Sequence, residues 1–245
     1  MLLPLIIIIG TSFDASGEIV FPPEGLTLEW YLEFLRTPAW IQASKNSLIT
    51  ATGTMALSTA LGTLTAFGVR RLSVGRTKWF TPLVLLPLLI PPVVTGVALL
   101  SFLGQIGLHQ TYFGIIIAHS LWATPIVFFV MQAVLSRFDW EIHEAAMDLG
   151  AGNLQSFREV IFPLIKNGLL ASALIAFVVS LQEFIMALFI SGFDTRTIPV
   201  IAWSQLRQTL DPLVSVISTL LIVATLIAFI PIVLSIGLER FSRNL

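Results

Sequence analysis

The 245-residue sequence contains no cysteine and few charges. Without thiols the chain can form neither disulfides nor thiolate metal sites. Acidic and basic residues together make up only 11% of the chain, too few to cover the surface of a soluble domain. The formal net charge is −1, so bulk charge gives no reason to expect nucleic-acid binding.

Three motifs of enzymes are also missing from the sequence. There is no G-x-x-x-x-G-K-[ST] loop, so the chain cannot cradle ATP phosphates itself. His143-Glu144 begins an H-E-x-x-H pattern, but Met147 occupies the place of the second histidine. No G-x-S-x-G motif anchors a serine hydrolase. We therefore expect a protein that is not an enzyme and that binds no metal or cofactor of its own.

What the sequence does contain is long apolar runs, because 56% of its residues are apolar. Runs of about 20 apolar residues have the length of a helix that crosses a bilayer. The first run is shorter, and we predict that its cytoplasmic half is missing from this sequence or lies upstream of its start. The alternative is the core of a signal peptide, but no basic start or small-residue cleavage site is clear. The prediction is an all-α membrane protein, one domain over residues 1–245, with six spans: 2–13, 47–69, 80–103, 112–135, 168–190 and 213–238.

Basic residues orient the predicted bundle. Nine of them lie on one side of the membrane and four on the other, and the side with more Lys and Arg is normally cytoplasmic. Both termini are then cytoplasmic, and the segments 14–46 and 191–212 are external loops, the first with a short helix over 28–35. The nine cytoplasmic cations are Arg70, Arg71, Arg76, Lys78, Arg137, Arg158, Lys166, Arg240 and Arg243; the other four are Arg36, Lys45, Arg196 and Arg207.

The cytoplasmic segment 137–166 reads as two short helices with a break. Residues 137–149 have a helical composition, and Gly150 can adopt the left-handed conformation that ends a helix. Asn153 is a good N-cap for a second helix over 154–162, and Pro163 is expected to end it. This helix would offer an apolar stripe to something outside the membrane, formed by Leu154, Phe157 and Ile161.

The same segment carries a long-spaced motif. It reads Glu144-Ala145-Ala146, then Gly150, then Val160-Ile161-Phe162-Pro163. Importer permeases of the ATP-binding-cassette (ABC) type carry E-A-A, three residues, G, nine residues and I-x-L-P, so this chain resembles that family. Val160 and Phe162 depart from the pattern but stay apolar. The small side chains of Ala145, Ala146 and Gly150 leave room for another backbone.

The resemblance implies the type I importer-permease fold, a place in the bacterial inner membrane, and several partners. In that family this segment is a coupling helix, docked in a groove of a separate ATPase subunit. The partners implied are two such ATPase subunits, which bind ATP and magnesium, a homologous second permease, and a solute-binding protein received by the external loops. The alternatives are an amphipathic helix on the lipid surface, an ion-coupled secondary transporter, or a structural membrane subunit.

Further segments resemble the spermidine/putrescine branch of these permeases. They are Asn46-Ser47-Leu48, residues 61–66, Ala118-His119-Ser120 and Asp148-Leu149-Gly150-Ala151. Permeases for ferric iron, aminoethylphosphonate, thiamine and sulfate share much of the layout. The resemblance implies transport of a small solute, with a polyamine as the first hypothesis.

Polar residues inside spans are costly and are therefore functional candidates. Glu183 is the only acid deep in a predicted span, accompanied by Ser180 and Gln182. The resemblance to spermidine/putrescine permeases implies that two consecutive acids at this place face the translocation path. Here Gln182 replaces one of them. Alternatively, Glu183 pairs with a neighbour or is neutral.

The third and fourth predicted spans add further candidates. His119 and Trp122 either line the path or, for His119, form a structural hydrogen bond between helices. Pro91 and Pro92 predict that the span over 80–103 is bent or broken. Broken helices are tolerated where they line a cavity, although a simple bend is the alternative.

Overall fold

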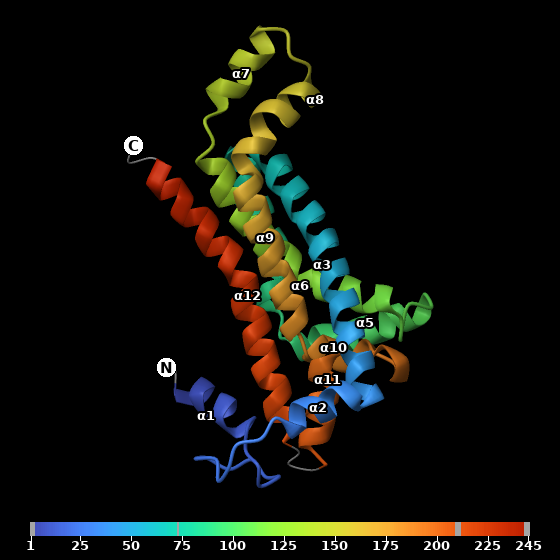
Figure 1. The fold of residues 1–245 in the computed structure, drawn as a ribbon. Coiled ribbons are helices and arrows are strands. Elements are labelled where there is room, and N and C mark those ends of the chain that lie inside the picture. Colours follow the sequence, from blue (N-terminus) through green and yellow to red (C-terminus); the bar gives the residue numbers. More distant parts are fainter. Residues whose placement is uncertain (1–2, 73, 209–211, 243–245) are drawn as a thin grey trace. The chain divides into compact units, whose positions relative to one another are not determined.

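The computed structural model describes residues 3–72, 74–208 and 212–242 (Figure 1). In these ranges it is helical, with no β-strand beyond a single bridge between Asp14 and Leu26, which confirms the all-α class. The helices are α1 (Leu3–Thr11), α2 (Glu29–Arg36), α3 (Pro38–Arg70), α4 (Val74–Leu85), α5 (Pro92–Gln105), α6 (Tyr112–Ser136), α7 (Trp140–Asp148), α8 (Asn153–Ser156), α9 (Phe162–Gln182), α10 (Ile185–Ile190), α11 (Ile198–Leu206) and α12 (Leu213–Ser242).

Three stretches of the described chain are long and apolar enough to cross a membrane as single helices, at Tyr112–Ser136, Asn153–Gln182 and Leu213–Pro231. A fourth candidate is a helix pair, Gly75–Leu89 with Pro92–Gln105, which meets the criterion only when both parts are taken together. By length and composition the described residues therefore contain three or four evident spans, where the sequence predicted six. The remaining two predicted spans correspond to α1 and α3.

Neither α1 nor α3 meets the criterion for a span, for different reasons. α1 has nine residues and is only about 13 Å long. α3 has 33 residues, but one of its faces carries a buried polar stripe. Most members of the stripe are four residues apart, the spacing of one helical face. They are Asn46, Ser47, Thr50, Thr54 and Ser58.

The breaks between helices are only partly those expected. In the third predicted span, α4 is followed by a 3₁₀ turn at Leu86–Leu89 and by extended residues at Ile90 and Pro91, after which α5 begins. This confirms the predicted break. The fifth, expected to be continuous over 168–190, is interrupted after Gln182. The loop expected over 14–46 is shorter, because α3 already begins at Pro38; proline suits a first helical turn.

The chain divides into two compact units. The first comprises residues 1–53, 91–119 and 178–228. Its buried apolar cluster joins α2, the start of α3 and the start of α12 through Phe34, Trp40, Leu213, Val216 and Ile217. In the same unit α5 packs against α10, and a Cβ added to Gly96 would lie 2.6 Å from Cδ2 of Phe189. The close approach of these two short helices depends on that glycine.

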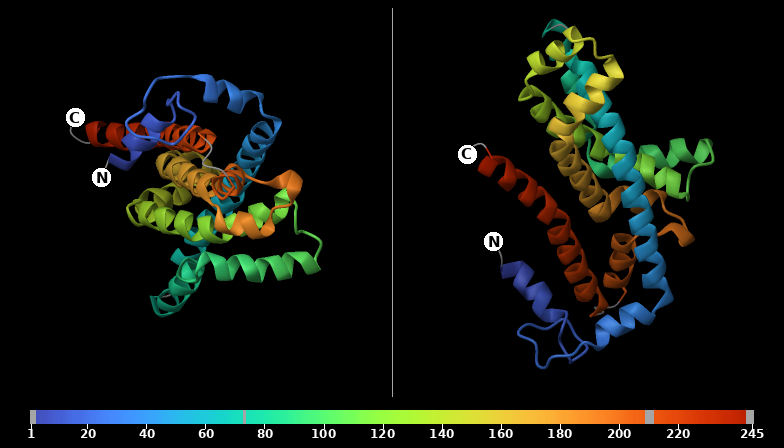
Figure 2. Two further views of the ribbon diagram at one scale, coloured as in Figure 1. Left: turned by 90° about the horizontal axis from the view of Figure 1, so that it is seen from below. Right: turned by 45° about the horizontal axis from the view of Figure 1, so that its top comes forward.

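The second unit comprises residues 54–90, 120–177 and 229–245. In it the later part of α3 runs beside α6, and α6 beside α9 (Figure 2). Glycines allow both close approaches, because a Cβ on Gly62 would lie 2.7 Å from Cγ1 of Val127, and one on Gly168 would lie 2.4 Å from Cγ2 of Val134. Small residues at helix contacts are typical of membrane bundles.

We expect Gly62→Ala to lower the Tm of the purified permease in detergent. The added methyl group would collide with Val127 and with the backbone nitrogen of Phe128, and overpacking costs about 1–3 kcal/mol. The matched control is Gly68→Ala on the same helix, where no atom of the described residues lies within 4 Å of the added Cβ. Alanine is a better helix former than glycine by about 1 kcal/mol, so this variant should keep or raise the Tm. Equal Tm changes in the two variants would contradict the described packing.

Candidate functional site

A carboxylate occupies the break between α9 and α10. Glu183 accepts hydrogen bonds from the backbone N–H of Met186, at 3.0 Å to Oε1, and from that of Ala187, at 3.0 Å to Oε2. The first N–H groups of a helix have no partner within it, and a negative charge there is favoured by the helix dipole. The side chain of Glu183 therefore caps the start of α10, and α9 ends one residue earlier, at Gln182.

A histidine of α6 meets the same carboxylate. Nε2 of His119 lies 3.2 Å from Oε2 of Glu183, and Nδ1 lies 2.7 Å from the hydroxyl oxygen of Ser180. His119 is fully buried, and the side chain of Glu183 is only 9% exposed. Glu183 thus has a neighbour with which to pair, as the alternative to a role in the translocation path predicted. A contact between this carboxylate and a transported solute stays a prediction.

The other two candidate path residues do not join this group. Gln182 is exposed and donates from Nε2 to the hydroxyl of Thr225 in α12, at 2.9 Å. Trp122 lies three residues beyond His119 on α6, in the second unit, and its Nε1 has no hydrogen-bond partner among the described residues. The structure therefore brings together three of the five residues: His119, Ser180 and Glu183.

A second polar cluster, which the sequence did not predict, binds the start of α3. The Nδ2 of Asn46 donates to the backbone oxygens of Asp194 and Arg196, at 2.9 and 2.8 Å, and its Oδ1 accepts from the hydroxyl of Tyr112 at 2.7 Å. Next to it, Ser47 accepts from the backbone N–H of Ile198 at 2.8 Å. The only signal in the sequence was an Asn-Ser pair at the edge of an apolar run.

One acid also holds the segment that was predicted as the first external loop. Asp14 is fully buried, and its carboxylate accepts from the hydroxyl of Ser16 and from the backbone N–H of Glu24, the latter at 2.9 Å. These bonds, the one from Ser16 first, lower the pKa of Asp14. The indole of Trp30 donates to the Asp14 backbone oxygen at 2.8 Å, which ties the loop to α2. Asp14 therefore stabilises the fold of this loop.

The predicted two-helix segment is present, with changes at its ends. α7 begins at Trp140 instead of Arg137, because Asp139 caps it by accepting from the backbone N–H of Glu141 at 3.0 Å. Gly150 has φ +93°, which confirms the left-handed stop. The second helix is preceded by Gly152 as its cap residue, so Asn153 is the first helical residue and does not cap it.

Pro163 does not end the second helix, contrary to expectation. Residues Phe157–Ile161 form a π turn, and the chain continues directly into α9 from Phe162. A wider π turn suits a following proline, because the ring needs space in the preceding turn and brings no N–H to it. As a result Ile161 is buried, and only Leu154 and Phe157 of the predicted apolar stripe remain exposed.

Aromatic contacts attach this hairpin, α7 with α8, to the end of α3. The guanidinium carbon of Arg70 lies 3.2 Å from the ring centroid of Trp140, and the ring centroids of Phe67 and Phe157 are 6.2 Å apart. Nδ1 of His143 and the hydroxyl of Ser156 join α7 to α8 at 2.7 Å. The hairpin projects beyond the end of α3 (Figure 1).

The outer surface of the hairpin is exposed and partly apolar. Glu144 and Ala145 are exposed and Ala146 is half-buried, while Leu149 is 90% and Leu154 62% exposed. Among the described residues, no atom lies within 4 Å of a Cβ built on Gly150. Exposed apolar side chains gathered on one projection typically mark a protein contact.

The helical fold, the interrupted spans and the E-A-A hairpin together define a permease of the importer class. Residues 58–242 match the family described as the binding-protein-dependent transport system inner membrane component, and the chain belongs to this family. It is therefore a membrane component of a transport system that works with a binding protein, and the permeases it is related to are not enzymes.

Three related permeases are named for the solutes that they transport. The chain is 31% identical over 226 residues to the putrescine transport system permease protein PotI of Escherichia coli (strain K12), covering 89% of this chain and 80% of that protein. It is 25% identical over 228 residues to the spermidine/putrescine transport system permease protein PotC of the same strain, covering 93% and 86%. It is also 32% identical over 180 residues to a probable molybdenum ABC transporter permease protein of Haloferax volcanii, covering 70% and 66%.

Solved structures agree with the fold. A bacterial ABC transporter for the import of alginate matches with a TM-score of 0.70 at 16% identity, over 98% of this chain and 90% of that one. An amino acid ABC transporter crystallised with histidines matches with a TM-score of 0.59 at 20% identity, over 90% and 100%. At these identities the likeness concerns the fold alone.

Proposed function

We propose that this chain forms part of the translocation path of an ATP-driven importer for a small cation of the polyamine class. The observation that carries the proposal is the similarity of nine-tenths of the chain to permeases named for putrescine and spermidine. The chain would contribute six spans with both termini in the cytoplasm and bind no cofactor. A homologous permease, two ATPase subunits with ATP and magnesium, and a solute-binding protein would complete the importer.

In this proposal the hairpin couples transport to ATP hydrolysis. Three features support the role: the E-A-A residues lie at the surface, Leu149 and Leu154 expose apolar side chains, and Gly150 holds the turn between the helices. An ATPase subunit that buries these side chains would gain apolar contact area. Closure of the ATPase dimer would then move α8 and, through the π turn, α9.

A second candidate substrate is an oxyanion. Glu183 is the only acid within the predicted spans, and both of its oxygens already accept hydrogen bonds from α10, with His119 beside one of them. If the negative charge of this single acid is already balanced by these N–H groups and by His119, the path attracts cations only weakly. The relative named for molybdenum transport, at 32% identity, also favours an oxyanion over a cation.

The complete importer, reconstituted with both permeases, the ATPase subunits and the binding protein, distinguishes these candidates. We expect binding protein loaded with putrescine or spermidine to stimulate ATP hydrolysis several-fold over empty binding protein. Stimulation by molybdate-loaded protein alone would replace the polyamine with the oxyanion. Solute uptake that is driven by an ion gradient in the absence of ATP would overturn the importer assignment itself.

A further inference from the structure

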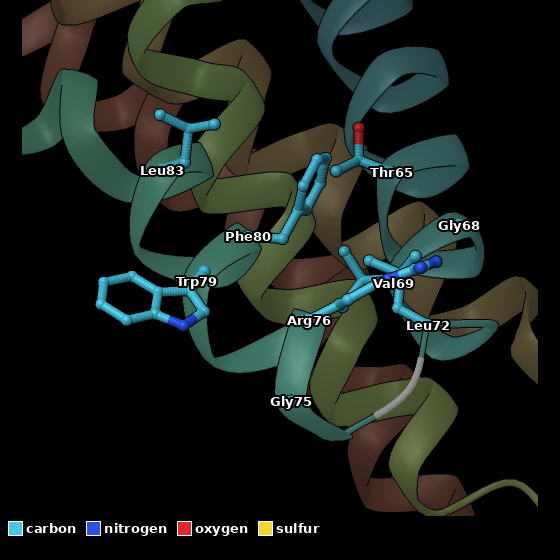
Figure 3. Close-up of a pocket in the computed structure, with 9 residues that line it drawn as sticks. All are labelled: Thr65, Gly68, Val69, Leu72, Gly75, Arg76, Trp79, Phe80 and Leu83. Carbon is cyan, nitrogen blue, oxygen red and sulfur yellow. The ribbon is translucent and has the colours of Figure 1, made fainter.

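An apolar groove lies between the end of α3 and the first turns of α4, within the second unit. Its volume is about 610 Å³, within the range of roughly 300–1,000 Å³ typical of small-ligand sites. Arg76 extends from α4 toward the end of α3 across the groove (Figure 3). The other lining residues are apolar or small, except Thr65: Gly68, Val69, Leu72, Gly75, Trp79, Phe80 and Leu83.

The groove walls are exposed, although they are apolar. Trp79 is 85% exposed, Leu83 62% and Phe80 40%. In a membrane protein such side chains face lipid chains or a neighbouring protein, and tryptophan is enriched at the level of the lipid headgroups. Gly68 on the opposite wall leaves open space, since no atom of the described chain lies within 4 Å of a Cβ built there.

One end of the groove is positively charged. Arg71, Arg76 and Lys78 are all exposed, and none of them forms an ion pair with another described residue. The sequence contains no acid between Glu33 and Asp139, so α3 and α4 supply no counter-charge. The acid that acts on this end is Glu144 of α7, which interacts electrostatically with Arg70. Arg70 places this end beside α7, outside the apolar part of the bundle, where a lipid phosphate would lie.

We propose that this groove binds an anionic phospholipid, with an acyl chain along Phe80 and Leu83 and the phosphate at Arg76. Arginine is suited to phosphate because its planar guanidinium can donate two parallel hydrogen bonds. Basic pockets between membrane helices are known to take anionic headgroups. The site is independent of the transported solute, so it does not rest on the polyamine assignment.

The test uses the complete importer in nanodiscs of phosphatidylcholine that contain a minority of lipid with brominated acyl chains, which quench nearby tryptophan fluorescence. The contribution of Trp79 is the quenching that is lost in Trp79→Phe. We expect brominated phosphatidylglycerol to quench Trp79 several-fold more than brominated phosphatidylcholine at the same mole fraction. Arg76→Gln should reduce this preference.

A matched pair of variants tests the groove itself. Gly68→Leu would fill it. Gly104→Leu adds the same side chain to α5, where the described residues likewise place no atom within 4 Å of the Cβ. We expect the first to remove the preference for phosphatidylglycerol and the second to retain it. Equal quenching by the two lipids would overturn the proposal, and so would a preference that survives Gly68→Leu. Absence of quenching by either lipid would show that the partner permease covers the groove, and would overturn it too.

Discussion

Replacing Gly150 with valine is expected to reduce the stimulation of ATP hydrolysis by loaded binding protein at least tenfold. Gly150 has φ +93°, a conformation that β-branched residues rarely adopt. The strain is on the order of 1–3 kcal/mol, and 1.4 kcal/mol already changes an equilibrium constant tenfold. Because the turn sets the angle between α7 and α8, its distortion would remove the surface that the ATPase subunit is proposed to bind.

Gly152→Val is the control for this experiment. Gly152 is also exposed, and no described atom lies within 4 Å of its Cβ position. Its φ of −72° with ψ of 162° is extended backbone that valine adopts readily. It should retain most of the stimulation, while Gly150→Asn should fall between the two variants, since asparagine tolerates the left-handed region. Full stimulation in Gly150→Val would show that the hairpin does not couple the subunits.

Glu183→Ala is expected to lower the Tm of the permease strongly and to abolish uptake. The change would leave the N–H groups of Met186 and Ala187 without their acceptor and the buried His119 without its partner. A hydrogen bond to a charged group contributes about 1.5–3 kcal/mol, so the total loss is a large part of a typical stability of about 5–15 kcal/mol. Thermal unfolding in detergent, beside uptake by the reconstituted importer, measures both effects.

Gln182→Ala, one residue earlier, provides the comparison. Gln182 is exposed and makes one neutral hydrogen bond, to Thr225, so its loss should cost no more than about 1 kcal/mol. A double-mutant cycle of Glu183→Ala with His119→Ala then isolates the pair. A coupling energy near zero would contradict the contact between His119 and Glu183. An unchanged Tm with uptake of cations lost would instead assign Glu183 to the path alone.

Local signals in the sequence predicted much of the helical layout. Apolar runs located α6, α9 and α12, the adjacent Pro91 and Pro92 predicted the break before α5, and Gly150 predicted the left-handed stop. Each of these rests on chemistry within a few residues. The positions of the same elements in a bundle were not predictable, because close approaches such as that of Gly62 to Val127 join residues far apart in the chain.

The break at Glu183 shows why other features were missed. No glycine or proline marks it, since the sequence there reads Leu181-Gln182-Glu183-Phe184. The acid caps α10, so α9 ends before it, and Nε2 of His119, 64 positions earlier, lies 3.2 Å from its Oε2. Pro163 misled in the other direction. It predicted the end of a helix, but a π turn just before it lets the helix continue. In both cases the local rule gave way to a neighbouring turn or a distant partner.

The polar stripe of α3 has a consequence for biogenesis. As α3 leaves the ribosome, Asn46 lacks its acceptors, which lie about 150 residues later at Asp194 and Arg196. At about 5–20 residues per second, that interval lasts roughly 7–30 s. A helix with unpaired polar groups enters lipid reluctantly. During those seconds Asn46, at the edge of the apolar run, must stay hydrated at the membrane surface, so the contacts that fix the start of α3 form only near the end of synthesis.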